Sequence, residues 1–241
     1  MTPAADSVIP FVATNGGRWL LENGTIKPSA SVHYSVTTWV QSPREGRDRG
    51  PAGMARAWAG TLVAPRSFFS EGVAPGDQEP GLTFIVTVAV IYTIGTLAVS
   101  PFSILGEDGW FPILGDSIAL SGFLVVLLTA VFIAPLGLHL VAAIQTVILM
   151  LTVDDRAGVS ETVQVLAYAT APCALAWIPF SPIQLFVVGY AVVLLVIGLS
   201  TVHDISIRLA AVVGFLPATI VFGWAFGGTA AAMTTIELLG V

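Results

Sequence analysis

The side chains that could do chemistry in this chain are few, and they lie within long apolar segments. They are His139, Gln145, Gln164, Tyr168 and Gln184. Proton- and ion-coupled transporters and intramembrane hydrolases usually hold carboxylates or amines at membrane depth, because such groups move charge or activate water. Amide, phenol and imidazole groups without such partners instead favour hydrogen bonds between helices.

His139 follows Pro135 by one helical turn and has two alternative roles. As a functional group it would be a ligand or part of a proton relay. As a structural group it would bond to another helix, for example to a carbonyl that Pro135 leaves free. We expect the structural role, because the sequence places no acidic partner nearby. We expect the three glutamines to form bonds between helices as well.

The sequence contains no motif of a soluble catalytic or cofactor site. It has no GxxxxGK[ST] phosphate loop, no HExxH zinc motif and no CxxC pair. The single cysteine, Cys173, lies in an apolar run and is expected to be a small buried hydrophobic residue. We therefore predict no catalytic, cofactor-binding or metal-binding residues, and a protein that is not an enzyme.

Composition places the chain in a membrane. Of its 241 residues, 55% are hydrophobic and only 10% are charged, whereas soluble domains have about 25% charged residues. The net charge is −6 and Lys27 is the only lysine, which argues against a nucleic-acid partner. The expected partner is the lipid bilayer, and the expected location is the cell membrane, crossed several times.

The apolar residues are grouped into segments long enough to cross a bilayer as helices. We predict an all-α, polytopic transmembrane helix bundle with five spans over residues 82–241. The spans are expected at about residues 82–100, 118–153, 162–178, 183–201 and 209–226. Proline lies inside the second, third and fifth of these segments, which membrane helices tolerate.

Residues 118–153 form an apolar run of about 54 Å as a straight helix, longer than a ~30 Å hydrocarbon core. The run crosses either once, as a long tilted helix, or twice, with a hinge at Pro135. A single crossing places all nine basic residues on one side, whereas a double crossing moves Arg156 and Arg208 to the other. The positive-inside rule favours the single crossing, with the N-terminus cytoplasmic and the C-terminus outside.

Residues 1–53 are polar or basic and lack periodicity, so we expect a disordered cytoplasmic region. In residues 54–81, Met54, Trp58 and Leu62 share one helical face. This segment is expected either to lie flat in the headgroup layer or to pack on the cytoplasmic ends of the spans. The candidate cytoplasmic interfacial residues are Trp58, Arg66, Phe68, Phe69, Arg156 and Arg208.

Three short stretches resemble the Yip-one domain family, in the form found in prokaryotes. Residues 167–172 (AYATAP) are similar to its third-helix signature, with residues 160–162 (SET) as the lead-in. Residues 199–206 (LSTVHDIS) resemble its loop before the last helix, and residues 65–69 (PRSFF) its element before the first span. In this resemblance, Tyr168 and Pro172 are a packing and hinge element.

The resemblance covers residues 37–226 and implies a five-helix membrane domain without catalytic residues. Eukaryotic members take part in vesicle trafficking and membrane shaping. This chain lacks their acidic N-terminal motif and has Ala167 in place of the usual glycine, so GTPase binding does not carry over. We predict a membrane-organising scaffold; the alternative is a transporter or channel for a neutral or lipidic solute.

Self-association and the start of translation are two further expectations. Gly223 and Gly227 form a GxxxG pair that favours close helix contact, so the partners are proteins or a second copy of the chain. Related prokaryotic chains begin near residue 37, so residues 1–35 are expected to result from a wrongly assigned start, with translation beginning near Val36.

The native protein should therefore be smaller than the full sequence. Intact-mass measurement of the protein from its own cells checks this, and a mass matching the complete 25.1 kDa chain would contradict it.

Overall fold

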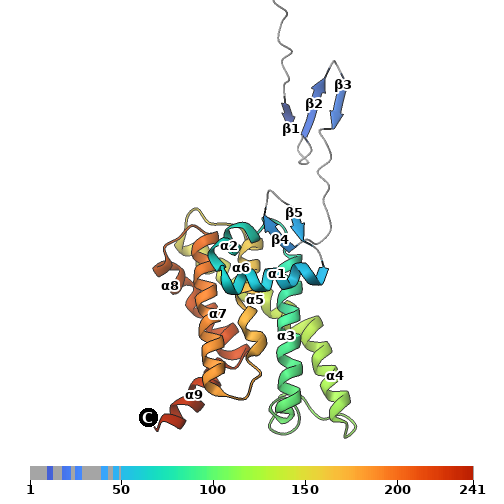
Figure 1. Cartoon of the computed structure of the whole chain (residues 1–241), viewed down its shortest axis with the longest axis vertical. Helices are drawn as coiled ribbons and strands as arrows, with labels where there is room; N and C mark the ends of the chain where they lie inside the picture. The colour runs from blue at the N-terminus through green and yellow to red at the C-terminus, as the bar shows by residue number, and fades with distance from the viewer. Residues whose placement is uncertain are drawn as a thin grey trace, which may run out of the picture. The chain divides into compact units, whose positions relative to one another are not determined.

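The computed structural model describes residues 10–12, 18–22, 25–28, 39–42, 46–48 and 50–240. The chain divides into two units, residues 1–36 and 37–241. In the first unit, strands β1 (Pro10–Val12), β2 (Arg18–Glu22) and β3 (Thr25–Pro28) form an antiparallel sheet in that order (Figure 1). Most of residues 1–49, for which disorder is expected, lie outside the described residues.

The second unit begins with a hairpin and two helices that precede the long helices. Strands β4 (Trp39–Ser42) and β5 (Gly46–Asp48) pair antiparallel, and helices α1 (Gly50–Val63) and α2 (Pro65–Gly72) follow. Pro65 separates the helices, because it disfavours the helical conformation of the residue before it, and Ala64 has φ −135° and ψ 59°. The helix predicted from the shared face of Met54, Trp58 and Leu62 is present as α1.

Four helices in the described part of the chain are long and apolar enough to cross a membrane. They are α3 (Glu79–Val99), the continuous run α4–η2–α5 (Ile118–Leu128, Thr129–Ile133, Ala134–Thr152), α7 (Ser181–Val202), and α8 with η4 (Ile207–Ala218, Thr219–Ala225). They coincide with four of the five predicted spans. The long second segment is one helical run, as the arginine distribution indicated.

The predicted third span, residues 162–178, is not one continuous helix. Helix α6 (Val159–Ala169) is followed by the 3₁₀ helix η3 (Ala171–Leu175). Pro172 explains the change, because it has no N–H to donate to the carbonyl one turn earlier and disfavours an α conformation at the preceding residue. The change of geometry lies at Pro172, the predicted hinge, and a fifth span over this apolar segment stays a prediction.

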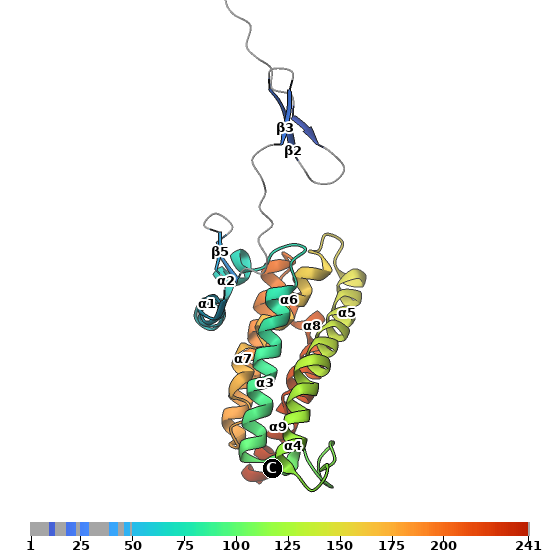
Figure 2. The same cartoon turned by 90° about the vertical axis from the view of Figure 1, so that its right-hand side faces the viewer.

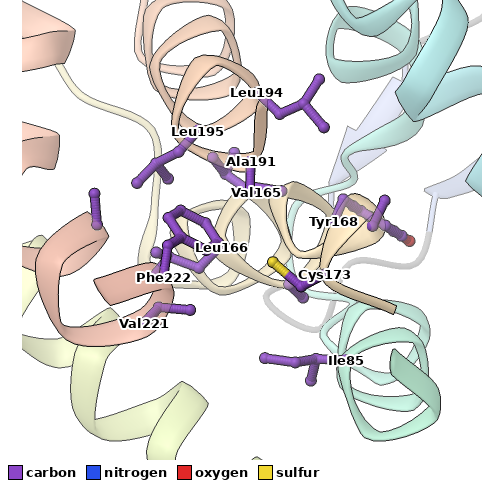
Figure 3. Close-up of a cluster of buried hydrophobic side chains, with 14 of the residues drawn as sticks. Ile85, Val165, Leu166, Tyr168, Cys173, Ala191, Leu194, Leu195, Val221 and Phe222 are labelled. Carbon is purple, nitrogen blue, oxygen red and sulfur yellow. The ribbon is translucent and has the colours of Figure 1, made fainter. Parts of the chain in front are cut away.

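Helix α6 and η3, together called the central segment, occupy the middle of the bundle. Every residue from 162 to 174 is buried, and α3, α5 and α7 all pack against α6. Side chains of α3, α7 and η4 converge on this segment, as seen around Leu166 and Cys173 (Figure 3). A helix that is apolar on all sides is stable only when protein surrounds it or lipid covers it, and here protein surrounds it.

Two of the long helices contain π-helical turns next to a proline. Segment η2 (129–133) ends just before Pro135, and segment η4 (219–225) begins just after Pro217. The wider turns are seen in the hydrogen bonds from Ala134 N–H to the Thr129 carbonyl and from Phe226 N–H to the Val221 carbonyl. Each irregularity widens its helix locally.

The chain ends with helix α9 (Gly228–Leu239), and the 3₁₀ turn η1 (Pro101–Ser103) follows α3. Gly227, with φ 76°, forms the turn between η4 and α9. The GxxxG pair therefore does not lie on one helix face, and the self-association expected from it stays a prediction.

The transverse pair, α1 and α2, lies across one end of the long helices. Figure 1 shows α1 roughly perpendicular to α3, and the turned view of Figure 2 shows it nearly end-on. This end also holds the α5–α6 loop, which carries Arg156, and the start of α8, which carries Arg208. We call it the α1 end; the other end holds η1, the loop before α4, and α9.

Candidate functional site

The transverse pair is attached to the bundle by hydrogen bonds and by aromatic rings. Trp58 Nε1 donates to the Ala171 carbonyl of η3 at 3.0 Å, and the Tyr190 hydroxyl of α7 donates to the Leu62 carbonyl. The rings of Phe68 and Tyr168 lie edge to face with centroids 4.9 Å apart. These contacts hold the C-terminal half of α1, together with α2, against the central segment and α7.

Phe69 is the most deeply buried aromatic side chain of the transverse pair, with 2% of its surface exposed. A Cβ on Gly198 would lie only 3.1 Å from the Phe69 ring, so the glycine leaves room for this ring. Trp58 and Phe68 are half-buried and also face the bundle. The aromatic residues expected in the headgroup layer thus pack on the helices, in agreement with the alternative placement, whereas the Arg66 side chain is exposed.

Gln164 fixes the link between α2 and α3. Its Oε1 accepts from the Ala74 N–H at 3.2 Å, and its Nε2 donates to the Ala74 carbonyl at 2.7 Å. The two bonds pair the side-chain amide with a backbone amide, as in one rung of a β-ladder. They satisfy the N–H and the carbonyl of Ala74, which lies between two helices. The Gln164 side chain is 1% exposed, so water does not compete for the bonds.

Gln145 and Gln184 have different surroundings from Gln164. Gln145 on α5 is fully buried, and in the described part of the chain neither its Oε1 nor its Nε2 has a hydrogen-bond partner. Gln184 Nε2 donates to the Ala176 carbonyl at 3.1 Å, in the turn before its own helix. Of the three glutamines, only Gln164 forms the long-range tie expected for all of them.

His139 is exposed on the surface of α5, and its Nδ1 lies 2.7 Å from the Pro135 carbonyl of the same helix. Because a carbonyl only accepts, Nδ1 carries the proton in this bond. The expected bond to another helix is therefore wrong. His139, Gln145 and Gln164 occupy three separate environments and do not form a continuous polar path.

His203, in the turn after α7, is 1% exposed and contacts the first turn of α6. Its Nε2 lies 3.4 Å from Thr162 Oγ1, while Nδ1 has no hydrogen-bond partner among the described residues. Burial lowers the pKa of His203 to about 4, and the positive charge of Arg156 acts in the same direction. The ring is therefore neutral at physiological pH and joins the α7–α8 turn to the central segment.

A cavity of about 570 Å³ lies between α3, the η2–α5 segment and η4, and extends toward the end opposite α1. Its wall is mainly apolar, with a few hydroxyl groups. The hydroxyl-bearing residues are Tyr92, Thr93, Thr96, Ser103 and Thr129. No sequence motif indicates this site; the prolines near both π-helical turns and the threonines within apolar runs are the features of the sequence that accompany it.

Comparison with known proteins gives one match. The family model for the Yip1 domain matches residues 59–228. No curated protein and no solved structure matches the chain.

The two buried glutamines should respond in opposite ways to replacement by methionine. Gln164→Met leaves the Ala74 N–H unpaired and removes the 2.7 Å bond to the Ala74 carbonyl, so it should lower the free energy of unfolding by about 2 kcal/mol. Gln145→Met removes an amide without partners and should raise it by about 1 kcal/mol. Thermal unfolding in detergent, followed with a dye that reacts with the buried Cys173 thiol, measures both changes. A loss of stability in Gln145→Met would show that the amide has a partner.

Stability should fall as the pH is lowered from about 6.5 to about 4, because only the unfolded state then protonates His203. The stabilising contribution is complete above pH 6.5 and is lost as the pH approaches the folded-state pKa. His203→Asn should flatten this part of the profile, measured by tryptophan fluorescence during thermal unfolding. Parallel profiles for the two proteins would contradict the assignment.

Proposed function

The chain belongs to the Yip1 domain family, whose model matches more than half of it, and on this basis we propose that it is a non-enzymatic scaffold. It is an integral membrane protein with several apolar helices that can cross the bilayer. In the proposed role, it organises the cell membrane and partner proteins, among them a second copy of the chain. The transverse pair and the loops at the α1 end provide the contact surface.

The attachment of the transverse pair is the observation that carries this proposal. Trp58, Tyr190 and Phe69 hold α1 and α2 on the bundle through contacts far apart in sequence. A surface held in this way keeps its shape when a partner binds, so less conformational entropy is lost on association. Arg66 and Arg208 are exposed at this end and supply positive charge for acidic protein surfaces or anionic headgroups.

We further propose that the chain crosses the membrane five times. The central segment connects the α1 end to the opposite end, and its α and 3₁₀ parts together rise about 26 Å, close to a ~30 Å hydrocarbon core. Within this span, residues 162–174 would have no lipid-facing side. Because Arg66, Arg156 and Arg208 then share the α1 end, the positive-inside rule places this end in the cytoplasm and α9 outside.

Transport of a neutral or lipidic solute is the second candidate function, and the cavity between the proline-broken helices favours it. The polar groups expected to line a solute path do not support transport. His139 is on the outer surface of the bundle, and Gln164 is engaged with the Ala74 backbone. We therefore place the scaffold role first.

Photo-crosslinking in native membranes tests the scaffold role. A photoreactive amino acid in place of Ser70, exposed on α2, should give discrete protein adducts of reproducible size. The same amino acid at Val193, exposed on α7, is the matched control and should give mainly lipid adducts. Arg66→Glu should reduce the adducts at position 70 about three- to fivefold, as expected for an exposed charge in an interface.

Flux of a neutral solute such as glycerol into reconstituted vesicles separates the two candidates. Under the scaffold role, wild type and His139→Ala should give the same flux as empty vesicles. Protein-dependent flux that His139→Ala changes, together with no protein adducts at position 70, would overturn the scaffold role in favour of transport.

A further inference from the structure

We propose that the cavity between α3, η2–α5 and η4 is a binding site for one acyl chain of a bilayer lipid. This site goes beyond the scaffold role and does not depend on it. Its volume of about 570 Å³ lies within the range of about 300–1,000 Å³ typical of small-molecule sites. The occupant follows from the depth, the lining and the opening of the cavity.

The depth of the cavity corresponds to one leaflet of the bilayer. Along α3 the lining residues run from Ile85 to Thr96, which is about 16 Å of helix. The hydrocarbon core of a bilayer is about 30 Å thick, so the cavity spans roughly half of it. Leu166 of the central segment lies at its wall deep in the bundle, and Ser103 and Trp110 of the loop after α3 lie at the opposite end.

The lining is suited to a hydrocarbon chain and unsuited to a charged group. None of the residues that line the cavity is an Asp, Glu, Lys, Arg or His. A charge placed inside would have no partner and would be strongly disfavoured. One of the few hydroxyls, that of Thr96, already donates to the Tyr92 carbonyl of its own helix at 2.9 Å, which leaves mostly hydrocarbon to contact a ligand.

The cavity reaches the surface that faces lipid. Among its lining residues, Ile133 is 44% exposed and Trp224 is 80% exposed. Each belongs to one of the two π-helical turns, so the wider turns form the sides of the opening. An acyl chain from the adjoining leaflet can enter here sideways without crossing the loops. It would then make contacts with wall residues that otherwise face empty space.

The end opposite α1 is suited to an uncharged or zwitterionic headgroup. Trp110 is 55% exposed there, and tryptophan commonly lies at headgroup level. The exposed residues Glu107 and Asp108 precede it in the same loop. Their negative charge disfavours an anionic headgroup, so the structure points to a phosphatidylcholine- or phosphatidylethanolamine-like lipid.

Gly137 and Gly189 give a matched pair of variants to test the site. A Cβ on either glycine would meet no atom within 4 Å, so both positions accept a larger side chain. Gly137 lines the cavity, whereas Gly189 is exposed on α7 and does not. Gly137→Phe therefore fills the cavity, and Gly189→Phe places the same ring elsewhere on the bundle.

The full chain is placed in nanodiscs of phosphatidylcholine that contain a trace of phosphatidylcholine with a diazirine near the end of one acyl chain. After irradiation, mass spectrometry should find adducts concentrated in residues 85–96 and 129–141, and unlabelled phosphatidylcholine should compete for them. Gly137→Phe should reduce these adducts about tenfold, a change of about 1.4 kcal/mol, and Gly189→Phe should leave them unchanged. Thermal unfolding of both variants shows that they are folded.

Adducts spread evenly over the outer surface, or equal labelling of the cavity in Gly137→Phe and wild type, would overturn the site. If Gly137→Phe does not fold, Ala134→Leu, which narrows the same wall, must lower the labelling. Competition by a free fatty acid but not by phosphatidylcholine would contradict a bilayer lipid as the source of the chain. Stronger competition by phosphatidylglycerol than by phosphatidylcholine would contradict the inferred headgroup preference.

Discussion

The burial of the central segment on all sides is the constraint on which the rest of the structure depends. In lipid there is no hydrophobic force between helices, so helices associate through close packing and hydrogen bonds. Small residues make this packing dense: Ala167 lies close to Gly81 of α3, and Val165 lies close to Gly198 of α7. Because Gly198 also leaves room for the Phe69 ring, the same packing that holds α6 in place holds the transverse pair.

The break at Pro172 connects the backbone of the central segment to the transverse pair. Irregular backbone is tolerated at membrane depth only where protein covers it, because free N–H and C=O groups are strongly disfavoured in hydrocarbon. Here Trp58 donates to the Ala171 carbonyl beside the break. Helix α1 therefore has a structural role besides presenting a surface, and a change at its aromatic face should also affect the centre of the bundle.

Hydropathy and charge predicted the long helices well, because both depend on local composition. The placement of Arg156 after the second segment was enough to indicate one continuous run, which Ile118–Thr152 forms. The sequence could not show that the chain changes from α to 3₁₀ geometry after α6, because an apolar segment can adopt either geometry. Nor could it separate Gln145 from Gln164, which differ only in whether the fold brings a backbone segment to the amide. The aromatic face of α1 was ambiguous for a related reason, since the same face can bury itself in lipid or against protein.

The two ends of the bundle differ in whether side chains fill the space beside irregular backbone. This difference is consistent with one fold that holds both a rigid surface and a lipid site. At the α1 end a side chain from a distant segment satisfies the irregular backbone, as Gln164 does for Ala74. Beyond the middle of the bundle, two prolines are each accompanied by a π-helical turn, and the space between these turns is not filled by side chains. A rigid surface for partners and a cavity for an acyl chain thus occupy separate parts of one fold. Leu166 of the central segment lines the cavity, and Gln164, two residues earlier, holds the α2–α3 link. The cavity and the α1 end therefore both contact helix α6.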